Sequence, residues 1–432
     1  MKRMLIVALA LLVPFLLFAG GAGEKQTAPA KPVTILATWG GDEELGFREV
    51  LDGFTKKTGI AYSYEGNRDS TVVLKSRVAG NNPPDIAFVP RPGEVAAYAK
   101  QGSIKALNEG KSDDMIPSSL LTANYGKAWI DLGTVDGKFY GLIAKANSKS
   151  TFWYKPASFK ALGVSAPNTW DDLLAIEDKY IAAGKTPLSI GAKDGWTLTD
   201  WFENIYVRMA GPDMYMKLHV THEVKWTDPS VVAAIQKFIQ VFTPADKKLA
   251  GGVTGTLSTG FIDAFNLVLR PNPAAEMYYE GGFMSSFAKQ NFPNLEPGKD
   301  YDFFEFPSID PQYGKPVVGG GDLAVAFSKN EGTAQLMRWL ASAEANTTWA
   351  SAKKGAVVSP NKNVSLSVYP VLTGKEAKQL TTAAIFVFDG SDMAPAAVGG
   401  DAEFTALQRI VKDPASYMDA LTFLEGVAAR SY

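Results

Sequence analysis

The chain places carboxylates beside an aromatic ring directly after its first expected strand. Trp39, Asp42 and Glu43 follow the apolar segment 33–39. A flat ring can stack on an apolar face of a ligand, and a carboxylate can accept strong hydrogen bonds from hydroxyl groups. Since open α/β sheets bind ligands at the ends of their strands, these residues are candidate ligand contacts. Asp42 alternatively serves the following helix as an N-cap or first-turn carboxylate.

Two further loops carry charged residues after expected strands. Arg68 and Asp69 follow a strand expected at 60–64, and Arg91 follows an apolar run at 85–89. Each position suits a ligand contact for the same reason as the first loop. The alternatives are a solvated turn for the first pair and a contact that holds the loop for Arg91.

The most suggestive group combines an acid with two indoles. Trp196, Asp200 and Trp201 lie in segment 195–201, which we expect to be a loop. This arrangement suits one stacked sugar ring whose hydroxyl groups are bound by the carboxylate. The alternative is that Trp201 anchors the core. The 9 Trp, 16 Tyr and 24 Phe decide little alone, because most aromatic residues are buried.

Composition limits the class of protein. The chain has 432 residues, with 43 Lys and Arg against 45 Asp and Glu. This length exceeds one ordinary core and predicts two lobes. The balanced charge excludes the basic stripe of a nucleic-acid-binding protein and favours a neutral partner. The chain has no cysteine, which excludes thiol catalysis, cysteine-ligated metal and lipid attachment to cysteine.

The N-terminal segment has the layout of a secretory signal peptide. Two basic residues precede an apolar run at 4–18, and small residues follow it. We predict a signal peptide at 1–22 and a flexible leader at 23–32. The apolar run is shorter than the roughly 20 residues of a membrane span, and we expect no membrane insertion after cleavage. An uncleaved anchor is the alternative.

Helical and strand patterns alternate along the rest of the chain, which predicts an α/β fold with a largely parallel sheet. Gly59 is expected to end the first helix. Asp228 and Pro229 are expected to begin another that runs to Val241. Further helices are expected at 72–78, 169–184 and 331–343, and from 413 onward.

Several segments resemble the carbohydrate-binding proteins of ABC importers. They are TWGGDE at 38–43, NPPDIAFV at 82–89, GSIKAL at 102–107, DGKFYG at 136–141, FWY at 152–154, PNTWD at 167–171, GGGDLAVA at 319–326 and SPN at 359–361. The segment FDGSD at 388–392 resembles the α-glucoside-binding branch.

This resemblance implies an α/β, two-lobed periplasmic-binding-protein fold of type II, with a hinge crossed three times and a ligand cleft between the lobes. The implied boundaries are 33–145 plus 321–365 for the N-terminal lobe, 146–312 plus 374–432 for the C-terminal lobe, and crossings near 145–150, at 313–320 and at 366–373. A bound solute closes such lobes. The implied protein is a periplasmic monomer that binds a mono- or oligosaccharide, uses no cofactor, and delivers its ligand to membrane permease subunits.

The resemblance also implies further contacts at the hinge and in the C-terminal lobe. They are Lys145 and Asn147 at the first crossing, Tyr279, Gly281 and Phe283 in a platform loop, Gly320, Gly321 and Asp322 beside the hinge, and Phe388, Asp389 and Asp392 at the end of the pocket. For Asn147 the alternative is backbone hydrogen bonding in the hinge.

Other classes of protein fit the sequence less well than a sugar-binding receptor. A glycosidase needs a spaced pair of carboxylates, which sequence alone does not place, and no hydrolase motif is present. His219 and His222, the only two histidines, are expected to lie on the surface rather than to bind a metal. A receptor of the same fold for a polyamine, an anion or a peptide remains the main alternative. An adhesion protein would be expected to carry repeats or an anchor.

Overall fold

The computed structural model describes residues 31–432, and the predicted signal peptide and most of the predicted leader lie outside these residues. The strands are β1 (Val33–Ala37), β2 (Tyr62–Gly66), β3 (Ile86–Val89), β4 (Thr134–Val135), β5 (Lys138–Phe139), β6 (Gly141–Ser148), β7 (Thr151–Tyr154), β8 (Leu188–Ser189), β9 (Met277–Tyr279), β10 (Asp302–Glu305), β11 (Val317–Ala326) and β12 (Phe386–Phe388).

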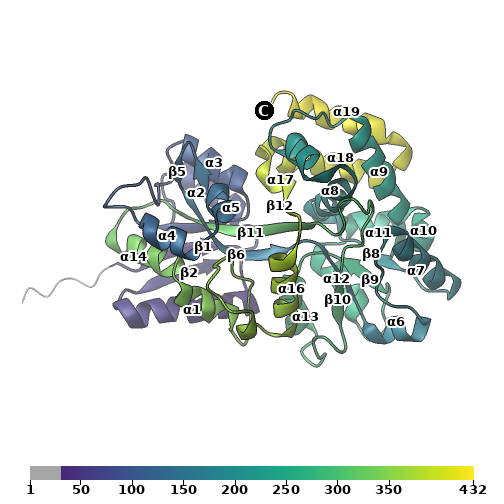
Figure 1. The fold of residues 1–432 in the computed structure, drawn as a ribbon, viewed down its shortest axis with the longest axis horizontal. Helices are drawn as coiled ribbons and strands as arrows, with labels where there is room; N and C mark the ends of the chain where they lie inside the picture. Colours follow the sequence, from purple (N-terminus) through teal and green to yellow (C-terminus); the bar gives the residue numbers. More distant parts are fainter. Residues whose placement is uncertain (1–30) are drawn as a thin grey trace, which may run out of the picture. The chain divides into compact units, whose positions relative to one another are not determined.

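Helices connect and cover these strands (Figure 1). They are α1 (Asp42–Thr58), α2 (Ser70–Ala79), α3 (Pro92–Lys100), α4 (Ser118–Asn124), α5 (Lys127–Leu132), α6 (Pro156–Leu162), α7 (Trp170–Ala182), α8 (Trp196–His219), α9 (Pro229–Phe242), α10 (Ala245–Lys248), α11 (Gly252–Ser258), α12 (Phe261–Leu269), α13 (Met284–Asn291), α14 (Glu331–Leu340), α15 (Ala343–Ala350), α16 (Val371–Thr382), α17 (Gly390–Met393), α18 (Glu403–Lys412) and α19 (Tyr417–Ala428).

The larger sheet has six strands in the order β12-β11-β3-β1-β2, with β6 paired to β11. β1 runs parallel to both of its neighbours, whereas β11 runs antiparallel to β3 and β6. Every residue of β11 is buried, which is expected for a strand covered on both faces. The expected parallel strands are therefore present in a sheet of mixed direction.

The smaller sheet has four strands in the order β10-β7-β9-β8. β7 pairs antiparallel with β10 and β9, and β8 runs parallel to β9. Only Lys149 and Ser150 separate β6 of the larger sheet from β7 of the smaller sheet. The chain therefore passes directly from one sheet into the other.

Each sheet has its own hydrophobic core. Trp39, Phe47 and Phe88 belong to one cluster on the larger sheet, and Leu36 and Val95 belong to a cluster on its other face. The smaller sheet packs into two further clusters, the larger of which includes α7, α8, α9, α18 and α19. This separation fits two lobes, while the lobe and hinge boundaries given above stay predictions.

Local sequence signals set most helix ends where they were predicted. Gly59 adopts a left-handed conformation after α1, as a C-terminal glycine cap does. Thr169 and Asp172 form a reciprocal capping box at α7, and the Asp228 side chain caps α9. The prediction of a loop at 195–201 is wrong, because α8 begins at Trp196.

Helix α8 is divided by a sharp kink at Gly211. This residue has φ 82° and ψ 170°, and Pro212 follows it. Such backbone angles are almost exclusive to glycine, and a side chain here would also collide with the Tyr313 ring. The kink turns segment 212–219 away from the axis of segment 196–210. It places His219 in the interior, with none of its surface exposed, so the expected surface position of His219 is wrong.

Within residues 31–432, none of the helices combines the length and the apolar character that crossing a bilayer requires.

We expect Gly211→Ala to lower the free energy of unfolding by about 1–3 kcal/mol, because alanine must adopt a backbone conformation that its side chain disfavours. Urea denaturation of both proteins measures this change. Gly426→Ala is the matched control, since Gly426 lies inside α19, where an added methyl group would meet only the Arg430 side chain, at 3.8 Å. This control should be neutral or stabilising by about 0.5–1 kcal/mol. Equal effects of the two substitutions would contradict the assigned role of Gly211.

Candidate functional site

Strand β6 directs a row of polar side chains toward one side of the larger sheet. Lys145 and Asn147 are two residues apart, and Lys149 follows at the same spacing, so the strand period places all three on one face. The Asn147 amide and the Lys149 stem both lie beside the α-carbon of Gly320 on β11. The glycine leaves room for both side chains.

A narrow cavity opens beside this row. Its walls come from α1, β6, the segment that begins α13, residues 356–358 and α16. Glu43, Asn147, Phe283 and Glu376 all line it. The cavity volume, taken as the space that the centre of a water molecule can occupy, is about 20 Å³. This space suits roughly one or two waters. A larger ligand therefore requires the walls to separate.

Lys145 is the centre of the first charged cluster, at the wall of the cavity. Its ammonium lies 2.9 Å from a Glu43 oxygen and 3.3 Å from an Asp322 oxygen. Arg68 approaches the other Glu43 oxygen at 3.4 Å, and the Trp39 indole donates a 2.7 Å hydrogen bond to Asp322. Burial alone would raise the pKa of Glu43, but Lys145 and Arg68 outweigh it and hold the pKa below its usual value.

Lys149 is the centre of the second charged cluster. Its ammonium bonds Asp389, lies 3.2 Å from Asp200 and lies 3.6 Å from Asp392. Arg91 from the start of α3 bonds Asp392 at 3.1 Å. Burial alone would lower the pKa of Lys149, but the three carboxylates raise it well above its ordinary value. The ammonium therefore stays charged in the interior.

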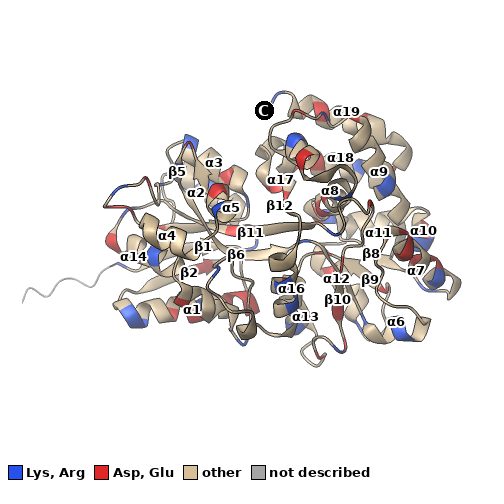
Figure 2. Ribbon diagram, in the orientation of Figure 1, with Lys and Arg blue, Asp and Glu red and all other residues tan. Residues whose placement is uncertain are grey.

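One aromatic residue connects the two regions. The Trp196 ring lies 5.7 Å from the Lys149 ammonium and 6.1 Å from the Phe283 ring. Trp196 and Phe283 are both partly exposed. Figure 2 shows acidic and basic residues interspersed over the helices. The charges of the two clusters are thus local features rather than part of a surface of one sign.

Residues 40–347 match the family described as bacterial extracellular solute-binding protein. The chain belongs to this family. The osmoprotective compounds-binding protein GgtB of Synechocystis sp. is 34% identical over 404 residues, which cover 92% of this chain and 93% of the relative. The alpha-glucosides-binding periplasmic protein AglE of Rhizobium meliloti is 30% identical over 393 residues, which cover 87% of this chain and 82% of the relative.

Solved structures show the fold of this solute-binding protein. The bacterial solute receptor AcbH, reported to prefer β-D-galactopyranose, superposes with a TM-score of 0.78 at 19% identity. The alignment covers 92% of this chain and 98% of that receptor. RafE in complex with raffinose superposes with a TM-score of 0.73 at 16% identity, over 92% and 99% of the two chains. The predicted two-lobed α/β fold of type II is confirmed.

The predicted contacts of the solute-binding protein fall into separate places. Glu43, Asn147 and Phe283 line the cavity. In the first charged cluster, Arg68 contacts Glu43 and Asp322 contacts Lys145. The second charged cluster contains Asp200, Asp389, Asp392 and Arg91. A ligand-binding role for these residues stays a prediction.

Four predicted aromatic contacts lie in the interior instead. Trp201 packs against Tyr279 and Phe152 in the core of the smaller sheet, which matches the anchoring role weighed for it. Trp39 and Phe388 are also buried in hydrophobic clusters. These rings do not face the cavity in this conformation. Trp39 and Tyr279 instead position polar neighbours, Trp39 by bonding Asp322 and Tyr279 by bonding the Lys149 carbonyl.

The remaining predicted positions are backbone or surface residues. Asp42 is in the first turn of α1, with Lys354 at 3.6 Å. Asp69 is exposed where α2 begins. Gly281 adjoins the Phe283 ring, and Gly321 pairs with Ala146 inside the sheet. Their predicted ligand contacts are untested.

Two central residues were missing from the sequence prediction. Lys149 lies two positions after Asn147, and its spacing from Lys145 was a usable signal that a strand would align them. Glu376 lies in α16, where its carboxylate accepts a 2.8 Å hydrogen bond from the Ser148 amide. Nothing in the local sequence of α16 indicates that it packs against β6.

Glu376 makes stability depend on pH. Burial raises the pKa of its carboxyl to about 8, from an ordinary 4.5. The native carboxyl keeps its proton up to about pH 8, whereas the unfolded chain releases it near pH 4.5. Unfolding thus releases a proton between these values, and this group lowers stability as pH rises across the window.

Glu376→Gln should therefore stabilise the protein by an amount that grows between pH 5 and pH 8. The upper limit of this gain is ~1.4 kcal/mol for each unit by which the native pKa of Glu376 is raised. Denaturant unfolding at pH 5, 7 and 9 measures the difference from the unmodified protein. The exposed Glu49→Gln on α1 controls for loss of one carboxylate. A difference that is constant with pH would show that Glu376 is ionised in the native state.

Proposed function

We propose that this solute-binding protein is a periplasmic receptor that binds a sugar or short oligosaccharide by lobe closure and delivers it to the permease subunits of an ABC importer. Family membership supports a receptor rather than an enzyme. The names of both relatives above refer to small solutes, and one refers to α-glucosides. An α-glucoside is therefore the first ligand to test.

The chemistry of the cavity carries the sugar assignment. Asn147 lines the cavity, and its buried side-chain oxygen has no hydrogen-bond partner within residues 31–432. An unpartnered buried acceptor is costly, and a ligand hydroxyl would satisfy it. Phe283 offers a ring face in the same cavity. A free acceptor beside an aromatic ring matches the hydroxyl rim and apolar face of a sugar.

The charges around the cavity favour a neutral ligand. Glu43 is already paired with Lys145, and the raised pKa of Glu376 keeps its carboxyl neutral at pH 7. A polyamine would require unpaired carboxylates, and an anion would require unpaired basic groups. Hydroxyl groups can instead share the paired charges by donating to Glu43 and accepting from Lys145.

The position of the cavity supports closure around the ligand. Glu43 and Asn147 belong to the larger sheet and its first helix, whereas Phe283 follows β9 of the smaller sheet. A ligand contacts both sets only when they are close together, and that difference in contacts would stabilise the closed state. The small volume of the cavity is what a closed conformation would show.

Calorimetric titration with maltose, trehalose, sucrose, glucose, spermidine and sulfate tests the ligand class. We expect one neutral sugar to bind in the micromolar range or tighter, with no product formed on long incubation. Binding of spermidine or sulfate alone would reject the sugar assignment and keep the receptor role. Consumption of a sugar would reject both.

Two cavity variants test the site itself. We expect Asn147→Ala and Phe283→Leu each to weaken sugar binding about fivefold, because each removes one hydrogen bond or one stacking contact worth ~1 kcal/mol. Phe423→Leu is the control, since Phe423 of α19 packs beneath Arg409 of α18. Unchanged affinity in both cavity variants would place the ligand elsewhere.

Small-angle X-ray scattering tests closure. Addition of the sugar that binds should reduce the radius of gyration, because the ligand-free protein must open to admit it. An identical radius with and without ligand would contradict the hinge mechanism.

A further inference from the structure

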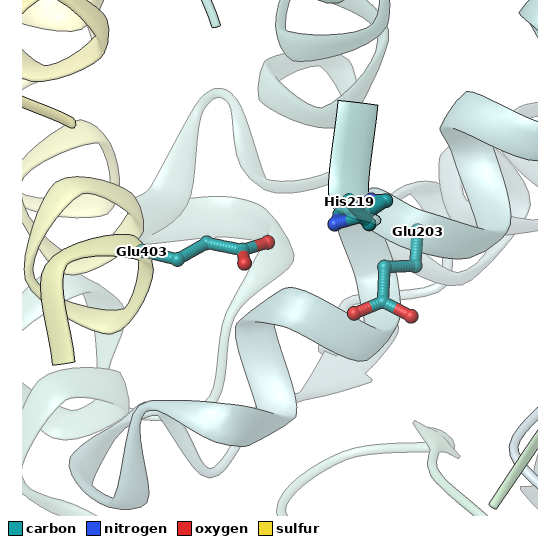
Figure 3. Close-up of side chains that lie close together, drawn as sticks. All are labelled: Glu203, His219 and Glu403. Carbon is teal, nitrogen blue, oxygen red and sulfur yellow. The ribbon is translucent and has the colours of Figure 1, made fainter. Parts of the chain in front are cut away.

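The kink in α8 gathers three buried groups that the sugar cavity does not use. Glu203 and His219 belong to the same helix but are 16 positions apart, which corresponds to about 24 Å along a straight helix. The turn at Gly211 removes this separation. Donor atoms of Glu203, His219 and Glu403 from α18 all lie within 4.8 Å of one another. In Figure 3, Glu403 extends from α18 toward the space beside His219 and the Glu203 carboxylate.

Two of these side chains are buried without partners. Neither ring nitrogen of His219 and neither carboxylate oxygen of Glu403 has a hydrogen-bond partner within residues 31–432. Both side chains have 0% exposure. Buried polar groups are normally satisfied by protein, water or an ion. Two unsatisfied groups directed at one space indicate a bound species there.

The acidic residues next to Glu203 already have a cationic partner in Lys149. Asp200 and Asp389 also lie close to Glu203, but the Lys149 ammonium bonds both of them. Lys149 makes no such bond to Glu403, whose two carboxyl oxygens have no hydrogen-bond partner within residues 31–432. An ion bound beside Glu403 would supply the partner that this carboxyl group lacks.

The third group is held in position by its surroundings. The Glu203 carboxylate accepts hydrogen bonds from the Gly390 amide at 2.8 Å and the Ser391 amide at 2.9 Å. The Tyr215 hydroxyl donates to it as well. Such outer contacts orient a metal-binding carboxylate. Neither ring nitrogen of His219 is engaged in a hydrogen bond within the described residues, so an imidazole lone pair is available to a metal ion.

We propose that Glu203, His219 and Glu403 bind one divalent transition-metal ion, with Zn²⁺ as the representative ion. One imidazole with two carboxylates is a donor set suited to Zn²⁺, whereas Ca²⁺ and Mg²⁺ prefer oxygen alone. Two carboxylates neutralise the charge of the ion, which a buried site requires. Donor atoms bound at about 2.0–2.2 Å would need only a small approach from their present separation.

The ion would join α8 to α18, two helices that pack in the core around the smaller sheet. It lies apart from the residues of the sugar cavity, none of which belongs to the three proposed ligands. The expected role is structural. Removing the ion should therefore lower thermal stability without abolishing the fold.

Zinc titration of the full chain, expressed without a polyhistidine tag and treated with a chelator, tests the site. We expect one Zn²⁺ per chain by calorimetry and by elemental analysis after gel filtration, and a higher melting temperature with Zn²⁺ than without. Glu403→Gln and His219→Gln should each weaken binding roughly 100-fold or more. Circular dichroism checks that both variants fold.

His222→Gln is the matched control, because it removes the only other histidine, which pairs with Glu425. It should bind Zn²⁺ as the unmodified chain does. X-ray absorption of the unmodified zinc complex should show one imidazole nitrogen with oxygen donors, and this measurement does not depend on any variant folding. Failure of the unmodified chain to bind Zn²⁺, or loss of binding in His222→Gln alone, would overturn the proposal and leave a buried water as the bridging species.

Discussion

The pairing of β6 with β11 forces two lysines into the interior, and much of the structure compensates for them. Lys145 and Lys149 are both at most 9% exposed. Leaving a buried ammonium without a partner costs several kcal/mol. Carboxylates from segments far apart in sequence therefore have to meet this strand. Glu43 and Asp322 meet Lys145, while Asp200, Asp389 and Asp392 meet Lys149. These acids come from α1, β11, α8 and the start of α17, so the two lysines connect elements that are far apart in the sequence.

This constraint also shapes the cavity. Asn147 lies between the two lysines on the same face, but its side-chain oxygen has no partner within the described chain. Its neighbours are held in fixed pairs, so a ligand would meet polar groups that are already oriented. Preorganised groups lower the entropy lost on binding. The same pairs link the two sheets, because Lys149 contacts acids on α8 and α17 while Arg91 of α3 contacts Asp392. A conformational change that separates the sheets has to break some of these pairs.

The region around α8 contains more buried acid than its basic groups can neutralise. Glu203, Glu280 and Glu403 all have raised pKa values because burial disfavours their ionised forms. Such a group lowers stability at neutral pH unless a proton or another cation remains with it. Stability alone would favour apolar side chains at these positions. A proton on each carboxyl group, or the metal ion proposed above, would meet this requirement for a cation.

Several helices and strands could be predicted from the sequence, because their ends depend on local signals. Gly59, Thr169 and Asp228 end or begin helices through contacts with residues only a few positions away. The segment 195–201 was misread as a loop because its start depends on packing rather than on a capping side chain. Three of the residues predicted as ligand contacts line the cavity, namely Glu43, Asn147 and Phe283, and their ligand contacts stay predictions.

Long-range packing decided the rest. Trp201 and Phe283 are both aromatic residues near polar neighbours in sequence, yet one lies in the core and the other lines the cavity. Glu376 reaches the cavity only because α16 packs beside β6. His219 is buried because one glycine turns its helix. The sequence by itself determined the kinds of side chain available and the local elements that carry them. Tertiary structure alone decided which side chains meet, because their contacts join residues more than 50 positions apart, whose separation in space no local pattern encodes.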